Sequence, residues 1–126
     1  MTQSKVAIVL QAGTGNHEQT ARALHSLIYA KELQERGNEV RLVFDGAGTE
    51  WLARWTEPQE GQDGQLAGFF QEVKQAGLVY SVCDFCAGAF QVRDKLVARE
   101  EPLVGQYMNH PSLASLVDEG FQVWIL

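Results

Sequence analysis

Residues 79–90 read VYSVCDFCAGAF, an apolar, β-like run that ends in Cys83 and is followed three residues later by Cys86. This pattern predicts a buried strand that leads directly into a helix. A thiol at such a junction faces the unpaired amides of the first helical turn and the positive end of the helix dipole, which favour the thiolate. The thiolate is the form that attacks sulfur or carbon and binds metal, so the stretch predicts a fold element and a candidate reactive site together.

Apolar and polar segments alternate along the rest of the chain in the same strand-then-helix order. Continuous apolar runs predict strands over residues 6–10, 40–44, 78–82 and 121–126, with a brief further strand at 103–105. Helical spacing predicts helices over residues 17–36, 50–55 and 66–77, one from the cysteines to 100–102, and one that starts at 109–112 with Pro111 near its first position and ends at Gly120. Residues 56–64 are polar and predict an exposed loop. We therefore expect residues 1–126 to form a single α/β three-layer domain, with a mostly parallel sheet of about four or five strands and helices on both faces.

The composition narrows the classes of partner. The chain has 126 residues, 45% of them hydrophobic, and a formal net charge of −6. An acidic domain with scattered Lys and Arg is a poor ligand for nucleic acid or an anionic membrane, so we expect neither partner. The N-terminus lacks a long apolar segment, which predicts a cytoplasmic protein whose two cysteines are mostly reduced.

Ligands of open parallel sheets bind outside the carboxyl ends of the strands, where the following loops meet. The cysteines are the chemically distinctive residues at this edge. The complete set of candidates is Asn16 and His17 after the first strand, Asp45 and Thr49 after the second, Cys83, Asp84 and Cys86 after the third, and Asn109 and His110 after the fourth.

Residues 36–44 (RGNEVRLVF) and 82–90 (VCDFCAGAF) carry a family resemblance. The chain resembles the DsrE/DsrF-like family of small sulfur-relay proteins over most of its length. The resemblance implies the DsrE-like α/β fold, a persulfide held on Cys83 as in TusD-like members, a sulfur donor or acceptor protein as partner, and assembly as a homo-oligomer, a trimer or hexamer. Two departures from the family pattern are Cys86, which would act as a resolving thiol, and the negative charge of Asp84.

Other interpretations of the cysteines stay open. They are also consistent with two buried packing residues in a non-catalytic oligomer that binds a small ligand or nucleotide, or with a CxxC thiol–disulfide protein. A zinc site is not expected, because a structural site needs four ligands and no second CxxC is present. Under the sulfur interpretation the chain is a carrier more than a turnover enzyme.

Two further motifs invite a functional interpretation. Residues 13–18 resemble a flavodoxin phosphate loop, but Ala12 and His17 replace the hydroxyl residues of that pattern and Glu18 adds negative charge, so a simple turn and no cofactor are expected. Trp51 and Trp55 are four residues apart on one helical face, and we expect them in the core or in a subunit interface.

Overall fold

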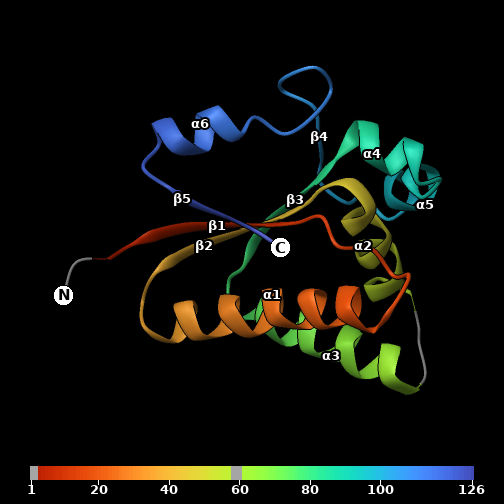
Figure 1. The fold of residues 1–126 in the computed structure, drawn as a ribbon, viewed down its shortest axis with the longest axis horizontal. Helices are drawn as coiled ribbons and strands as arrows, with labels where there is room; N and C mark the ends of the chain where they lie inside the picture. Colours follow the sequence, from red (N-terminus) through yellow and green to blue (C-terminus); the bar gives the residue numbers. More distant parts are fainter. Residues whose placement is uncertain (1–2, 58–60) are drawn as a thin grey trace.

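A parallel β-sheet forms the centre of the computed structural model, which describes residues 3–57 and 61–126. Within these residues, five strands are hydrogen-bonded in the order β4-β3-β2-β1-β5, and every pairing is parallel (Figure 1). The strands are β1 (Lys5–Leu10), β2 (Glu39–Phe44), β3 (Val79–Cys83), β4 (Leu103–Val104) and β5 (Gln122–Ile125). The predicted sheet, including the brief fourth strand, is confirmed.

Helices cover both faces of this sheet, which confirms the predicted α/β class (Figure 1). Helices α1 and α3 lie on one face and α6 lies on the other, while α2, α4 and α5 lie toward the carboxyl end of β3. The helices are α1 (His17–Glu35), α2 (Thr49–Trp55), α3 (Gly61–Gln75), α4 (Asp84–Ala89), α5 (Arg93–Ala98) and α6 (Leu113–Asp118), and a 3₁₀ turn, η1 (Gly46–Gly48), precedes α2. Among the described residues, none of the helices is both long and apolar enough to cross a membrane.

The apolar run of β1 is buried on both sides because successive side chains of a strand point to opposite faces. Val6, Ile8 and Leu10 join the core cluster that includes residues of α1, α2 and α3. Ala7 and Val9 join a smaller cluster with residues of β2, α6 and β5. The continuous apolar pattern therefore encodes a strand between two helical layers.

Trp51 and Trp55 lie in the core of this chain, at 1% and 2% exposure. Trp55 stacks on Phe70 with ring centroids 5.4 Å apart and meets Phe44 edge-on at 5.8 Å. Phe44 and Phe70 also contact Tyr80 edge-on. These aromatic rings join α2 and α3 to the sheet, so the pair belongs to the core rather than to a subunit interface.

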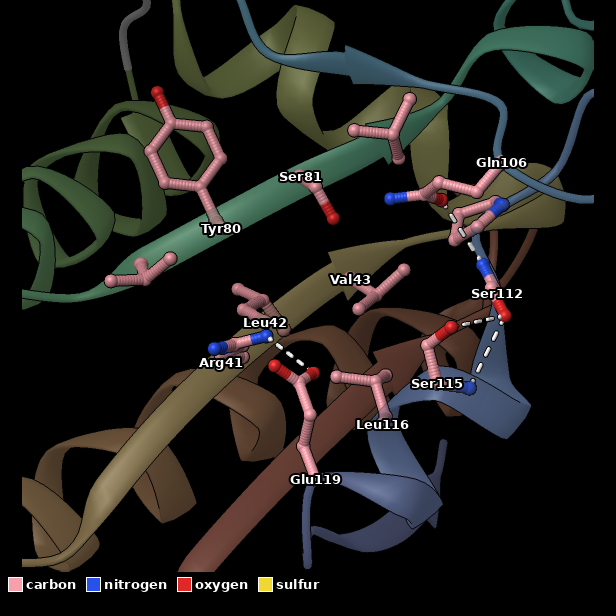
Figure 2. A pocket seen from close by; sticks show the side chains of 13 residues that line it. Arg41, Leu42, Val43, Tyr80, Ser81, Gln106, Ser112, Ser115, Leu116 and Glu119 are labelled. Atoms are coloured by element: carbon pink, nitrogen blue, oxygen red, sulfur yellow. Dashed lines mark hydrogen bonds and ion pairs between the residues drawn. The ribbon is translucent and has the colours of Figure 1, made fainter.

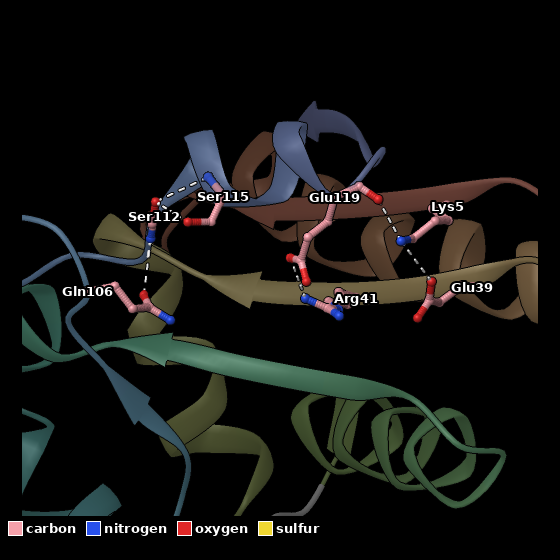
Figure 3. A network of polar contacts seen from close by, with 7 residues as sticks. All are labelled: Lys5, Glu39, Arg41, Gln106, Ser112, Ser115 and Glu119. Carbon is pink, nitrogen blue, oxygen red and sulfur yellow. Dashed lines mark hydrogen bonds and ion pairs between the residues drawn. The ribbon is translucent and has the colours of Figure 1, made fainter.

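Polar contacts hold α6 against the opposite face of the sheet (Figure 3). Lys5 Nζ donates to the backbone oxygen of Glu119 at 2.6 Å, and the Glu119 carboxylate pairs with Arg41 at 3.4 Å. At the other end of α6, the backbone N–H of Ser112 donates to Gln106 Oε1 at 3.1 Å. A cavity of about 170 Å³ remains between β2, β3 and α6, with the Arg41–Glu119 pair on its wall (Figure 2).

The predicted helix from the cysteines to residue 100 is wrong, because the chain forms two short helices, α4 and α5. Helix α4 ends at Ala89 with Phe90 as its C-cap, and the next residue, Gln91, takes the left-handed conformation with φ 62°. The Gln91 N–H donates to Gly88 O and the Val92 N–H donates to Ala87 O, the two bonds of a Schellman C-cap. This cap usually contains glycine, so glutamine gave no sequence signal for it.

Two predicted boundaries also need correction. Helix α3 begins at Gly61, so residues 61–64 of the expected loop are helical, while residues 58–60 of that loop lie outside the described residues. Helix α6 begins at Leu113, with Ser112 as its N-cap, so Pro111 lies before the helix rather than near its first position. Residues 107–110 instead form a tight turn, in which Tyr107 and His110 exchange backbone hydrogen bonds of 2.9 and 2.8 Å.

Candidate functional site

The two cysteines lie at the carboxyl end of β3, where the strand leads directly into α4. Cys83 is the last residue of the strand and the N-cap of α4, with extended backbone angles of φ −65° and ψ 120°. Its Sγ accepts a hydrogen bond from the backbone N–H of Cys86 at 3.4 Å. Both residues are free thiols, and the three-residue spacing brings their side chains together at the start of the helix.

The two thiols differ in exposure. Cys83 is fully buried, whereas Cys86 is partly exposed. The pKa of the Cys83 thiol is raised to about 12, mainly by burial, which outweighs the backbone N–H of Cys86 that lowers it. The side-chain hydrogen bond and charge of Cys86 and the charge of Asp45 make smaller contributions to the same rise. The helix-terminal amides that favour a thiolate therefore do not prevail at Cys83.

The negative charge of Asp84 affects the two thiols less than its position next to Cys83 in the sequence suggests. Its carboxylate accepts a hydrogen bond from Arg93 Nε at 2.7 Å. This hydrogen bond is the main cause that holds the pKa of Asp84 below its usual value, so the group is ionised and its charge is compensated. Arg93 belongs to α5, and the Schellman turn after α4 brings α5 back toward the site.

Asp45 is the charged neighbour of Cys86. It follows the end of β2, and its Oδ1 accepts a hydrogen bond from Cys86 Sγ at 3.8 Å. Its second oxygen, Oδ2, accepts one from Gln11 Nε2 at 2.9 Å. The loops after β1 and β2 thus contribute an oriented carboxylate to the thiol pair.

The turn after β4 completes the cluster. A ring nitrogen of His110 and the sulfur atoms of Cys83 and Cys86 all lie within 4.8 Å of one another. The backbone oxygen of Asn109 accepts a hydrogen bond from the Phe85 N–H at 3.1 Å and a weaker one from Cys83 Sγ at 3.9 Å. The Phe85 ring lies beside the His110 imidazole, with centroids 4.9 Å apart. Residues 24 positions apart in sequence therefore meet at one edge of the sheet.

The structure separates the other predicted site residues from this cluster. Asn16 caps α1 by accepting a hydrogen bond from the Gln19 N–H at 2.9 Å. His17 is exposed and lines a different cavity, of about 530 Å³, with Trp51 and Leu66 among its walls. Thr49 is buried, and its hydroxyl donates to Gly46 O at 2.9 Å. These three residues therefore hold local structure or face another surface.

The glycine loop at residues 13–18 is stabilised by contacts within the chain. Trp51 Nε1 donates to Gly13 O at 2.9 Å, and the Gly15 N–H donates to Gln19 Oε1 at 2.8 Å. A side chain at Gly13 would place its Cβ 2.8 Å from that of Ala47. These contacts support the turn interpretation, since they account for the glycine and one of the amides without a phosphate.

Three residues in contact with the cluster were missed in the sequence: Gln11, Phe85 and Arg93. Gln11 lies directly after the first apolar run, so its position at the sheet edge was a usable signal. Phe85 and Arg93 had none, because their roles depend on the turn after β4 and on the break between α4 and α5.

Comparison with known proteins agrees with the fold and extends over almost the whole chain. A protein from Methanocaldococcus jannaschii described as uncharacterized is 27% identical over 100 residues, which cover 79% of this chain and 76% of that protein. A solved structure of a conserved protein of unknown function from Bacteroides thetaiotaomicron matches with a TM-score of 0.65 and 21% identity, covering 98% of this chain and 95% of that one.

The crystal structure of the ychN protein from E. coli matches with the same TM-score of 0.65 and 14% identity, covering 98% of this chain and 100% of that one. At these identities the structural matches establish the fold alone. The family model described as the DsrE/DsrF-like family matches residues 4–124. The chain therefore belongs to the DsrE/DsrF-like family.

Proposed function

We propose that this chain is a cytoplasmic sulfur carrier that holds sulfane sulfur as a persulfide on its cysteine pair. The observation that carries the proposal is the placement of two free thiols, within 4.8 Å of each other, at the carboxyl end of a central strand. Membership of the DsrE/DsrF-like family supports the same chemistry. A reducing cytoplasm would keep both thiols available.

The two cysteines are suited to different roles. The resemblance assigns the persulfide to Cys83, and that assignment stays a prediction. Cys86 is better suited to meet the donor, because it is partly exposed while Cys83 is buried and its pKa is raised. The hydrogen bond from Cys86 Sγ to Asp45 orients this partly exposed thiol.

The transfer is a thiol exchange that needs no oxidant besides the donor persulfide. The Cys86 thiolate attacks the outer sulfur of a donor R–S–SH, a new S–S bond forms, and R–S⁻ leaves and takes a proton. An acceptor thiolate then attacks the outer sulfur of the Cys86 persulfide and regenerates the Cys86 thiolate. Alternatively, the Cys83 thiolate attacks the inner sulfur, which closes a Cys83–Cys86 disulfide and releases H₂S.

Intact mass spectrometry after incubation with glutathione persulfide tests the proposal. The reduced, metal-free protein should gain the mass of one sulfur atom, and dithiothreitol should remove it. We expect Cys86→Ala to abolish the adduct and Cys83→Ala to retain it, with less conversion to disulfide. Loss with Cys83→Ala alone would restore the assignment implied by the resemblance.

No adduct on the folded wild-type protein would contradict the sulfur-carrier proposal. It would favour a non-catalytic protein that binds a small ligand, with the cysteines as packing residues. A disulfide without any persulfide adduct would favour the CxxC thiol–disulfide interpretation instead.

We also propose that the chain forms a homo-oligomer, a trimer or hexamer. Large apolar side chains remain exposed on the protomer, including Val79, Tyr107, Met108, Val117 and Ile125. Such residues are commonly buried by association in small α/β domains. Light scattering at micromolar concentration should give the mass of three or six chains, and a monomer mass of 14.0 kDa would contradict the proposal.

A further inference from the structure

We propose that Cys83, Cys86 and His110 form a binding site for a zinc-type divalent ion, with Asp45 beside Cys86. Their ligand atoms lie within 4.8 Å of one another, although they come from the end of β3, from α4 and from the turn after β4. This inference concerns the reduced protein and does not rest on the proposed sulfur function. It departs from the expectation from sequence that no metal site is present, which assumed that further ligands would appear as a second CxxC.

The ligand set has the chemistry that zinc prefers. Two cysteine sulfurs and one imidazole nitrogen are common ligands of tetrahedral zinc, at about 2.3 Å for sulfur and about 2.0 to 2.1 Å for nitrogen. These lengths place two ligated sulfurs about 3.8 Å apart in a tetrahedral site. The observed separations, all within 4.8 Å, exceed these tetrahedral separations by at most about 1.0 Å for the two sulfurs and about 1.3 Å for sulfur and nitrogen. Magnesium and calcium, which prefer oxygen ligands, fit this set poorly.

His110 is held with one ring nitrogen free for a metal. Its Nδ1 lies 2.6 Å from the backbone oxygen of Met108. A carbonyl oxygen only accepts, so Nδ1 donates in this hydrogen bond, and in the neutral imidazole the lone pair is then on Nε2. Histidine ligands of metals usually make such a second hydrogen bond, which fixes the tautomer and the ring orientation.

The surrounding residues hold the imidazole in place before any ion binds. Phe85 lies beside the His110 ring, and its backbone N–H donates to Asn109 O. The paired backbone bonds between Tyr107 and His110 close the turn. Asn109 adopts a left-handed φ of 59°, and its side chain lies against Gly105, where a Cβ atom would collide with it. The turn therefore presents His110 in one defined position.

Asp45 supplies the remaining polar group. Its Oδ1 is 3.8 Å from Cys86 Sγ, and Gln11 Nε2 binds its other oxygen at 2.9 Å. The carboxylate is thus held beside one of the two sulfur ligands, outside the group of three ligand atoms that lie within 4.8 Å of one another. Binding of the ion replaces the two S–H protons, which pass to the buffer, so two thiolates balance the charge of the cation.

Zinc competition against a chromophoric chelator and Co²⁺ absorption spectroscopy test this inference on the reduced full-length protein. We expect one ion per chain and a Co²⁺ spectrum with sulfur-to-cobalt charge-transfer bands. Cys86→Ala and His110→Gln should each weaken binding by more than about 100-fold, because loss of outer hydrogen-bond partners alone costs about 10- to 100-fold. Asp45→Asn should weaken binding less.

His25→Gln is the matched control, since His25 is an exposed histidine on α1 outside the cluster. Circular dichroism identifies variants that remain folded, and Cys86→Ala and His110→Gln change partly exposed positions rather than the core. Absence of one-to-one binding by the wild type, or unchanged affinity in both folded variants, would overturn the inference.

The persulfide assay distinguishes the two proposals. It uses metal-free protein with a chelator, so persulfide formation without zinc binding would refute only the metal site. Zinc binding without a persulfide adduct would refute only the sulfur carrier.

Discussion

Burial of Cys83 should make its thiol far less reactive in the folded protein than in the unfolded chain. Burial is the main cause that raises its pKa from the ordinary 9.0 to about 12. At pH 8 the thiolate fraction is then about one in ten thousand in the folded state and about one in ten in the unfolded state. Ionisation alone predicts an alkylation rate about 1000-fold lower in the folded protein, and the lack of exposed surface lowers the rate further.

The assay is iodoacetamide labelling of the Cys86→Ala variant, followed by mass spectrometry in buffer and in urea. Burial, the largest cause of the shift, is unchanged in this variant, although the smaller contributions of the Cys86 side chain are lost. The Cys83→Ala variant is the matched control, because it reports the partly exposed Cys86 alone. A folded-state rate within tenfold of the rate in urea, or a rate that levels off below pH 9, would refute the reasoning.

The same pKa shift predicts how stability changes with pH. Below pH 9 the thiol is protonated in both states and the shift has no effect. Above pH 9 the unfolded chain loses the Cys83 proton while the folded protein keeps it, so the free energy of unfolding falls by at most about 1.4 kcal/mol per pH unit toward pH 12. Burial and Glu101 also raise the pKa of Tyr80, so the effect of Cys83 must be taken as the difference between the wild type and Cys83→Ala in urea titrations.

The remaining predictions concern the packing that supports the site, and urea unfolding measures each. Gly48→Ala should destabilise the protein by more than about 2 kcal/mol, because a Cβ there collides with the backbone oxygen of Leu10 and lies 2.8 Å from its carbonyl carbon. Gly68→Ala is its control, since Gly68 is exposed in α3 with open space around it, and should stabilise by about 0.5 to 1 kcal/mol. Phe70→Ala should cost about 3 to 5 kcal/mol, because Phe70 is fully buried among aromatic rings. Phe90→Ala, at a side chain that is 40% exposed, should cost less than about 1 kcal/mol, and equal losses at the two phenylalanines would contradict the described core.

The sheet could be predicted from sequence because its signals are local. A parallel strand between two helical layers needs apolar side chains on both faces, and residues 6–10 show that requirement without any tertiary information. The signal for the end of α1 is also local, because Gly37, which follows Arg36, has a φ of 80°, a conformation that glycine favours. The split between α4 and α5 could not be predicted, because Gln91 adopts a conformation for which glutamine gives no signal.

The candidate site was predicted in part. The alternation of strands and helices and the rule for carboxyl ends were sufficient to bring Asp45, Cys83, Cys86 and His110 to one edge. These arguments were not sufficient to exclude His17 or Thr49 from the candidate site, because the loops after β1 and β2 are long enough to direct successive residues to different surfaces. Side-chain partners such as Gln11, which orients Asp45, are visible only once the loops are placed.

The burial of each thiol, more than its position in the CxxC motif, determines how readily it reacts at this edge of the sheet. Sequence arguments placed both cysteines next to helix-terminal amides, and the family resemblance assigned the persulfide to Cys83 and a resolving role to Cys86. In the folded chain Cys83 is buried and lies 3.9 Å from the backbone oxygen of Asn109, whereas Cys86 is partly exposed and hydrogen-bonded to Asp45. We have proposed that sulfur enters at Cys86 and that a divalent ion binds Cys83, Cys86 and His110. Both proposals involve the turn after β4, because it carries His110 and its Asn109 oxygen accepts a hydrogen bond from Cys83, so the short fourth strand before this turn matters to the site together with the cysteine motif.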